Sequence, residues 1–200
     1  MPEGDAVRRL AGTLDELFVG GIVSASSPQG RFASSAALLD GWVMQRVRVH
    51  GKHMFIGFVP PAPGETYEAG VALLEGAAAG SGEPILGEDA PWPDRWVHIH
   101  LGLYGWWRFN GDETVVDEGH GVAHRIPNAQ KGEWNGHSET RWGEGFGEAK
   151  AGEWEPPEPV GAVRLRVSND HAVADLIGPN RCDLITDEER ITAESKLGPD

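Results

Sequence analysis

The most regular hydrophobic pattern of the chain lies in residues 4–18, where apolar residues recur at steps of three and four. The apolar positions are Val7, Leu10, Ala11, Leu14, Leu17 and Phe18. This period places them on one face of an α-helix. Glu3 and Asp5 suit the positive end of the helix dipole, and Gly20-Gly21 ends the helix. The pattern therefore predicts an amphipathic N-terminal helix packed on a core.

Most of the remaining apolar residues alternate with polar ones, as in half-buried strands. Residues 42–50 predict one such strand, and residues 54–59 predict its return after a turn at Gly51, which places Lys52 and His53 at a hairpin tip. Further strands are expected over 22–25, 96–101, 106–109, 163–168 and 172–176, with a short helix over 34–40 and a short element over 182–185. The fold class is therefore mostly β with an N-terminal helix (α+β). We expect a two-layered antiparallel β-sandwich of about 6–8 strands flanked by helix 4–18.

Two acidic stretches, at about 60–95 and 111–160, interrupt this pattern. They are rich in Gly, Pro and Glu, and the first holds only a weak apolar run at 71–74. We interpret them as insertions within one domain of residues 1–185. Trp134, Trp142 and Trp154 in the second stretch are either docking points for a partner protein or loop packing.

The amino-acid composition limits the kinds of protein that this chain can be. The chain has 200 residues, of which 40% are hydrophobic, enough for one substantial core. It shows neither an 18-residue apolar run nor a basic-then-apolar leader, so we expect no membrane span and no secretory signal. The one cysteine, Cys182, excludes a disulfide and a multi-cysteine zinc site within this chain. These features favour a cytoplasmic protein.

The net charge of -14 is unusual for a nucleic-acid-binding protein. The acidic excess lies in residues 60–95, 111–160 and 182–200, whereas the segments with a clear structural pattern are mildly basic. Screening over about 8 Å at physiological salt lets a local basic face act despite distant acidic residues. Charge alone leaves two interpretations open: a local binding face, or general avoidance of polyanions.

The first residues carry candidate chemistry. If Met1 is removed, Pro2 becomes a free secondary amine followed directly by the carboxylate of Glu3. Such an amine has a pKa near ~8, so roughly a tenth of it is neutral at pH 7. It can attack an aldehyde-like sugar carbon to give a cationic Schiff base, while Glu3 transfers protons. A retained Met1 would place this nitrogen in a peptide bond and prevent the reaction.

Two other motifs bear on function. Leu103 and Tyr104 lie between two predicted strands, where an exposed tip would favour insertion into a partner, although both side chains can instead fold back into the core. His98 and His100 share a strand face. They are candidates for a metal site, but no third ligand is evident, and ordinary polar pairing is the favoured interpretation.

Taken together, these motifs resemble the formamidopyrimidine-DNA glycosylase/endonuclease VIII family of base-excision repair enzymes. The resemblance rests on Pro2-Glu3-Gly4-Asp5 before the helix, on residues 48–53 around Lys52, and on residues 100–105 followed by Trp107-Arg108. The amino-acid sequence of the last segment is closer to that of the endonuclease VIII branch, which favours oxidised pyrimidines.

The resemblance implies a bifunctional DNA glycosylase/AP lyase that ends in β/δ-elimination. Its catalytic residues would be Pro2 as the Schiff-base nucleophile, Glu3 as the proton donor to the ring oxygen, and Lys52 beside a phosphate. Leu103 and Tyr104 would form the wedge that fills the space left by a flipped-out base. The DNA-binding set implied by the resemblance is Gly102, Leu103, Tyr104, His100 and Arg31. Gly102 stands where the endonuclease VIII branch often has a polar side chain.

The resemblance covers only the family's N-terminal half. It implies that residues 186–200 are a linker toward a helix–two-turn–helix domain absent from this chain. The family's zinc finger would lie in that missing half, so we expect no cofactor in this chain. The expected partner is double-stranded DNA with oxidised or abasic sites, in a cytoplasmic, nucleoid-associated protein.

Two alternatives stay open. One is a non-catalytic DNA- or protein-binding module from a truncated or degenerate paralogue. The other is a tautomerase in which an N-terminal proline acts as a general base, a chemistry that requires neither Lys52 at a hairpin tip nor a Leu-Tyr wedge.

Overall fold

A computed structural model describes residues 3–62, 92–116, 140–142 and 146–197. For residues 3–5, 116 and 140–142 the description covers only the backbone. The predicted strand at 71–74 and Trp134 lie outside the described residues, as does most of the first acidic insertion.

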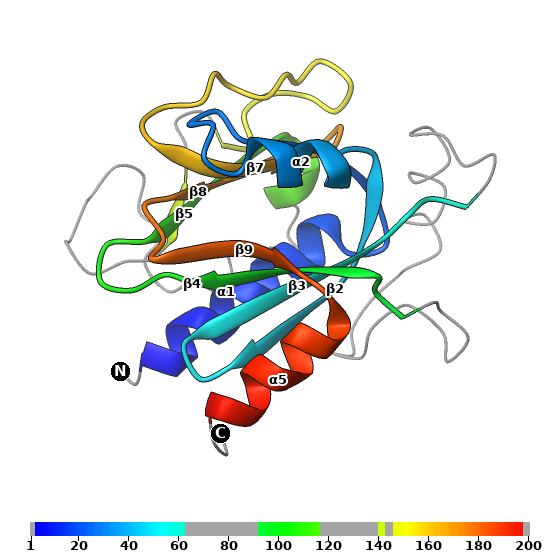
Figure 1. Cartoon of the computed structure of the whole chain (residues 1–200). Helices are drawn as coiled ribbons and strands as arrows, with labels where there is room; N and C mark the ends of the chain where they lie inside the picture. Colours follow the sequence, from blue (N-terminus) through cyan, green and yellow to red (C-terminus); the bar gives the residue numbers. More distant parts are fainter. Residues whose placement is uncertain (1–2, 63–91, 117–139, 143–145, 198–200) are drawn as a thin grey trace.

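The N-terminal helix α1 spans Glu3–Phe18 and confirms the prediction for residues 4–18. Its predicted apolar face is buried, with Leu10, Leu14 and Phe18 exposed by 2% or less. α1 packs against the β2–β3 hairpin (Figure 1). Because a helix rises about 1.5 Å per residue, this buried face fixes the direction in which the start of the chain points.

The described strands form one continuous nine-stranded arrangement in the order β6-β5-β8-β7-β1-β2-β3-β4-β9. Their bounds are β1 Ile22–Ser26, β2 Trp42–His50, β3 His53–Val59, β4 Arg95–His100, β5 Trp106–Gly111, β6 Thr140–Trp142, β7 Val163–Ser168, β8 Ala172–Ile177 and β9 Arg181–Ile185. Among the described pairs, β5–β6 is parallel and the others are antiparallel.

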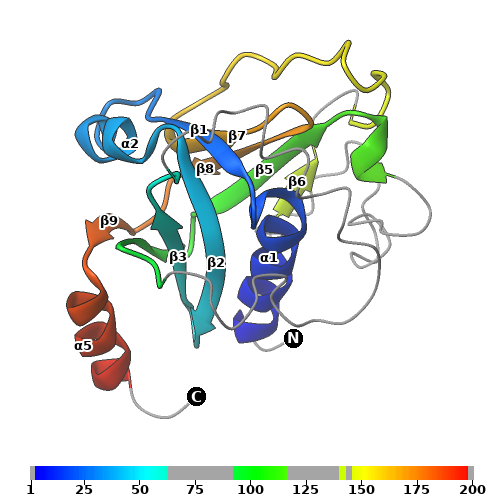
Figure 2. The ribbon, with the colours of Figure 1, turned by 90° about the vertical axis from the view of Figure 1, so that its right-hand side faces the viewer.

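Strand β1 joins the two halves of this arrangement. Ile22 and Val23 pair with β2, whereas Ser24, Ala25 and Ser26 pair with β7. The β2-β3-β4-β9 half and the β7-β8-β5 half contribute to one core together with α1 (Figure 2). The predicted mostly-β α+β fold is confirmed, with one strand more among the described residues than the upper end of the expected range.

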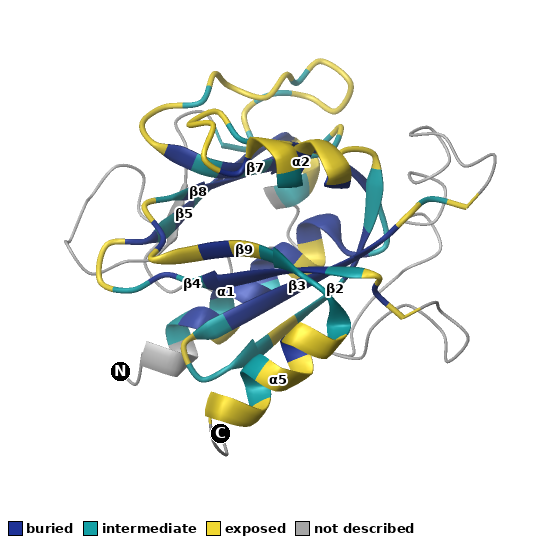
Figure 3. Cartoon of the chain, in the orientation of Figure 1, coloured by how far each residue is buried: buried dark blue, intermediate teal, exposed yellow. Residues whose placement is uncertain are grey.

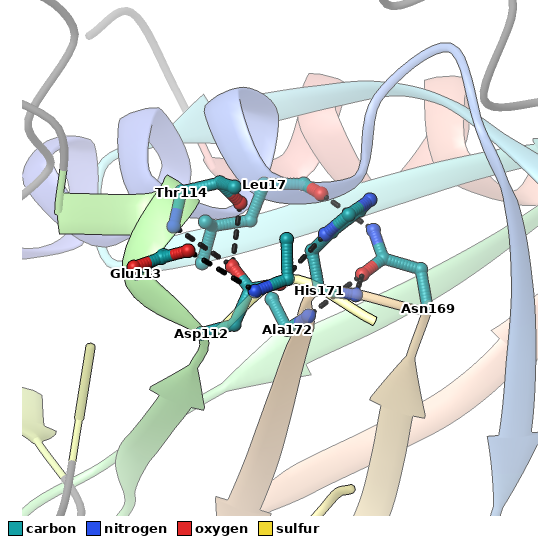
Figure 4. A network of polar contacts seen from close by, with 8 residues as sticks. Leu17, Asp112, Glu113, Thr114, Asn169, His171 and Ala172 are labelled. Atoms are coloured by element: carbon teal, nitrogen blue, oxygen red, sulfur yellow. Dashed lines mark hydrogen bonds and ion pairs between the residues drawn. The ribbon is translucent and has the colours of Figure 1, made fainter. Parts of the chain in front are cut away.

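A polar network fixes the far end of α1 to the second half of the fold (Figure 4). The side chain of Asn169 donates to the carbonyl of Leu17 at 2.9 Å and accepts hydrogen bonds from the backbone of His171 and Ala172. His171 Nδ1 lies 2.8 Å from Oδ2 of the buried Asp112, whose Oδ1 accepts from Thr114. These contacts hold the helix at its C-terminal end, so its N-terminal end keeps a defined position.

Two further α-helices and a short 3-10 helix, η1 at Glu113–Val116, complete the described fold. α2 spans Ala33–Leu39, as the sequence predicts, and packs on β1. α5 spans Asp187–Leu197, within the segment predicted to be a linker. Its start is a capping box, since Thr186 Oγ1 accepts from the Glu189 N–H and the Glu189 side chain accepts from the Thr186 N–H. The prediction that a further domain follows this segment stays a prediction.

The side chain that docks α5 is charged. Arg190 is 4% exposed and makes ion pairs with Asp187 and Glu194. Its guanidinium lies 4.7 Å from the ring centroid of Trp96 on β4, a cation–π arrangement. None of the described helices is long and apolar enough to span a membrane.

Candidate functional site

The predicted hairpin tip is present. β2 ends at His50 and β3 begins at His53, with these two residues paired across the strands. Gly51 adopts a φ of +56°, which favours glycine, and Lys52 is exposed in the turn. The placement of Lys52 at the tip is confirmed, whereas His53 belongs to the strand.

The loop between β4 and β5 contains two large, exposed apolar residues, and part of this loop has the colour of exposed residues in Figure 3. Leu103 is 84% exposed and Tyr104 is 81% exposed. A backbone hydrogen bond from Gly105 to Leu101 closes the loop at its base. The interpretation that these side chains fold back into the core is wrong. Their exposure is unusual for large apolar residues that neighbour one another, and it marks a surface for contact with another molecule.

A cleft of about 200 Å³ brings the turn, the loop and the first helix together. It is lined by Val7, Lys52, His100, Leu101, Gly102, Leu103 and Asn180. Val7 lies about 6 Å along the axis from the start of α1, at a rise of about 1.5 Å per residue. The beginning of α1 and the turn between β2 and β3 therefore lie on the same side of the molecule, as both ribbon views show (Figures 1 and 2). Pro2 and the side chain of Glu3 lie outside the described residues.

Asn180, which the sequence did not single out, occupies the space beside Gly102. A Cβ atom added to Gly102 would lie 2.3 Å from Asn180 Nδ2, and Gly102 has a φ of +67°. The carboxamide of Asn180 therefore fills the position that a side chain at residue 102 would need. Since an amide both donates and accepts hydrogen bonds, the cleft retains a polar group at this point although residue 102 is a glycine.

Replacing Gly102 by Ala is expected to lower the free energy of unfolding by about 1–2 kcal/mol, mainly because alanine at positive φ is strained. The new Cβ would also displace the Asn180 side chain. Chemical denaturation of the variant measures the total loss in the free energy of unfolding from both effects. In a Gly102→Ala/Asn180→Ala double variant the cost should fall toward the backbone strain alone, about 1 kcal/mol. Equal costs in the single and double variants would show that Asn180 does not occupy this space.

The predicted polar pairing of the β4 histidines is confirmed, and it includes a third histidine from β3. His53 Nδ1 lies 2.8 Å from His98 Nε2, and the His53 ring stacks on His100 with centroids 4.6 Å apart. Burial, followed by the nearby charges of His53, Arg181 and His100, lowers the pKa of His98 to about 4. Burial also lowers the pKa of His53. Within the described residues, no group of three or more His, Cys, Asp or Glu side chains is arranged to hold a metal ion.

Two other sequence candidates lie away from the cleft. Arg31 is exposed in the turn before α2 and is not among the cleft-lining residues. Cys182 is buried, and burial raises the pKa of its thiol to about 12, so it is not a reactive thiolate. The described site thus unites Lys52, His100, Gly102 and Leu103 of the predicted set, with Tyr104 exposed beside them.

Comparisons with known proteins agree with this geometry. No protein-family model matches the chain. The proteins named Endonuclease 8 1 from Mycobacterium tuberculosis and Mycobacterium bovis are 31% identical to it over 200 residues, which is 100% of this chain and 48% of each relative. Along its whole length the chain therefore resembles proteins of the formamidopyrimidine-DNA glycosylase/endonuclease VIII family.

Solved structures support the fold of this family. Lactococcus lactis Fpg (MutM) in a complex with an oxidized pyrimidine containing DNA has a TM-score of 0.52 at 12% identity, covering 98% of this chain and 48% of that one. The same protein with N7-Benzyl-Fapy-dG containing DNA has a TM-score of 0.50 at 13% identity, covering 98% and 46%. The chain spans about half the length of the relatives it matches.

Proposed function

We propose that this chain is the N-terminal catalytic domain of a bifunctional DNA glycosylase/AP lyase that removes oxidised bases, pyrimidines in preference. The cleft carries this proposal, because it places the first turns of α1 beside Lys52 and the exposed Leu103. A reaction at a sugar carbon next to a phosphate requires a nucleophile, a cation and a side chain that keeps the damaged base outside the DNA double helix. Each of these can reach the cleft from a different element.

Pro2 is the proposed nucleophile. The neutral imino nitrogen attacks C1′ of the damaged nucleotide, the base leaves, and Glu3 protonates the ring oxygen as the sugar opens. The resulting cationic Schiff base draws electrons from the neighbouring C–H bond, which permits elimination of first the 3′- and then the 5′-phosphate. α1 begins at Glu3, the residue that follows Pro2 in the sequence.

Lys52 is the proposed contact to the phosphate beside the lesion. It is exposed at the rim of the cleft, where a lysine ammonium acts as a compact positive charge. Leu103 and Tyr104 are the proposed wedge. Flipping a base out of the duplex costs a few kcal/mol of stacking, and an apolar side chain placed in the vacated space offsets part of that cost.

The direct test is covalent trapping. Mass spectrometry of the purified chain first establishes whether Pro2 is the N-terminal residue. Incubation with a duplex that contains an abasic site, in the presence of borohydride, should then give a stable protein–DNA adduct whose modified peptide begins at Pro2. If a chain with free Pro2 binds this duplex without forming any adduct, the proposal of an enzyme is wrong. The alternative of a non-catalytic DNA-binding module is then favoured.

A further inference from the structure

The ends of four neighbouring strands carry a row of basic side chains beside the cleft. His50 pairs with His53, His53 pairs with His100, and His100 pairs with Arg181. Residues that oppose one another on adjacent antiparallel strands share a face of the sheet. At about 4.8 Å between strands, the row from β2 to β9 extends over roughly 14 Å. We refer to His50, His53, His100 and Arg181 as the basic row.

The basic row continues the rim of the cleft. Lys52 and His100 both line the cleft, and Asn180, which precedes Arg181, lines it as well. Lys52 lies in the turn that connects His50 to His53. The length of the row exceeds the rise of about 3.4 Å between successive phosphates of one DNA strand, so it is long enough to contact more than one phosphate.

We propose that the basic row is a second phosphate-binding site, which holds the DNA backbone next to the phosphate at Lys52. This inference rests on the proposed function for the presence of DNA at the cleft. It adds His50, His53 and Arg181 to the binding surface, and it makes His98 the positioning residue of the row.

The hydrogen bonds around His98 determine how His53 is presented. Arg181 Nη1 lies 3.5 Å from His98 Nδ1, and an arginine can only donate. Neutral His98 therefore carries its proton on Nε2 and donates it to His53 Nδ1, 2.8 Å away. His53 in turn carries its proton on Nε2. The chain of donors runs from Arg181 through His98 to His53, and it ends in an N–H that is available to an acceptor.

The surrounding charges keep this pair neutral in the free protein. The charged or titratable groups on the neighbouring elements are Arg48 and His50 on β2, Lys52 in the turn, His100 on β4, Arg181 and Asp183 on β9, and Glu194 on α5. Of the two carboxylates, Asp183 pairs with Arg181 of the row at 3.1 Å and offsets part of its charge, and Glu194 pairs with Arg48 at 3.3 Å. Burial and this mostly positive surrounding both lower the pKa of His53.

A bound phosphate has the opposite effect on the pKa of His53. Its negative charge favours protonated His53, and once Arg181 turns toward the phosphate, His98 Nδ1 no longer accepts from it. His98 can then carry its proton on Nδ1 and accept from doubly protonated His53 through Nε2. Binding should therefore take up a proton from solvent, and affinity should rise as the pH falls from 8 to 6.

The test uses the whole chain and a duplex with a tetrahydrofuran abasic analogue, which resists cleavage. Fluorescence anisotropy gives the dissociation constant at several salt concentrations, at pH 8 and at pH 6. We expect about three- to tenfold tighter binding at pH 6 for one linked proton. Arg181→Gln should lower the slope of log affinity against log salt by about 0.9 at both pH values, whereas His53→Gln should lower it only at pH 6.

Arg95→Ala is the matched control, because Arg95 lies at the opposite end of β4 from His100 and is not among the cleft-lining residues. It should leave the slope unchanged. In wild-type protein, NMR of the imidazole resonances should show the pKa of His53 rising when the duplex is added, a measurement that needs no variant.

The outcomes separate this inference from the proposed function. Unchanged salt slopes in both variants, together with an unchanged His53 pKa, would overturn the proposal that the basic row binds phosphate, even if borohydride trapping succeeds. Altered slopes without trapping would support the row and reject the Schiff-base chemistry. At saturating DNA, trapping by Arg95→Ala should equal that by wild type, because Arg95 lies outside both the row and the residues that line the cleft.

Discussion

Adding two residues before Pro2 is expected to abolish borohydride trapping of abasic DNA altogether. In such a variant the Pro2 nitrogen is part of a peptide bond. An amide nitrogen has no available lone pair for attack on C1′, so no Schiff base can form. Gel electrophoresis after borohydride treatment measures the adduct directly, and loss of at least a hundredfold in adduct yield is the expected result.

The matched control carries the same two residues after Asp200, which changes mass and composition equally and leaves Pro2 untouched. It should be trapped as efficiently as the unmodified chain. DNA binding by the N-terminally extended variant should persist, because Lys52 and the exposed Leu103 do not depend on the amine. Full trapping by the extended variant would mean that the nucleophile is a lysine or the new terminal amine, and not the Pro2 nitrogen.

Glu3→Gln separates the roles of the first two residues. Pro2 remains a nucleophile toward an abasic site, which already exposes an aldehyde, but the proton donor to the ring oxygen is lost. Release of an oxidised base should therefore fall much more than trapping of a preformed abasic site. A comparison of the two substrates with the same variant thus distinguishes the glycosylase step from the lyase step.

The sequence predicted those elements whose hydrophobic period is local. Helix 4–18 and strand 42–50 have regular patterns over many residues, and they appear as α1 and β2. It also predicted which residues lie at tips, since Gly51 and the glycines around Leu103 mark the turns. Lys52, Leu103 and Tyr104 are consequently found exposed at tips.

The features that it missed depend on contacts between distant segments. Asn180 reaches Gly102 through the pairing of β9 with β4, and Arg181 reaches His98 in the same way. The histidine cluster illustrates this limit of prediction from the sequence. His98 and His100 were recognisable as neighbours on one strand, but His53 joins them only because β3 pairs with β4.

Helix α5 was missed for a different reason. Its docking face is a buried arginine against tryptophans, so the residues 187–197 lack the apolar stripe that signals a packed helix. The capping box at Thr186 and Glu189 was the available signal. Arg31 is not among the cleft-lining residues, and its place in the DNA-binding set stays a prediction, because an isolated basic residue carries no information about which side of the fold it will occupy.

Replacing Asp175 by Ala is expected to lower the free energy of unfolding by about 3–5 kcal/mol. Asp175 on β8 is 2% exposed and lies between Arg108 on β5 and Arg166 on β7, its direct partners across the strands. Arg166 binds both carboxylate oxygens, at 2.7 and 3.0 Å, and Arg108 binds one at 2.7 Å. Without the carboxylate, two largely buried guanidinium groups would face each other unpaired.

The same two arginines hold the segment that crosses this face. Arg166 donates to the carbonyl of Pro157 at 2.8 Å, and Arg108 donates to that of Val160 at 3.4 Å. Loss of Asp175 should therefore also make this segment more accessible to proteases, because the guanidinium groups lose their fixed orientation. Urea denaturation measures the stability, and limited proteolysis measures the release.

Asp183→Ala is the control, since it also removes an aspartate from an ion pair on a strand. Asp183 and Arg181 are 57% and 52% exposed, and exposed pairs contribute about 0–1 kcal/mol. For a chain of this size, about 4 kcal/mol corresponds to a fall in Tm of roughly 8–16 °C, against at most ~4 °C for the control. Similar losses in the two variants would show that the buried carboxylate contributes no more than a surface charge.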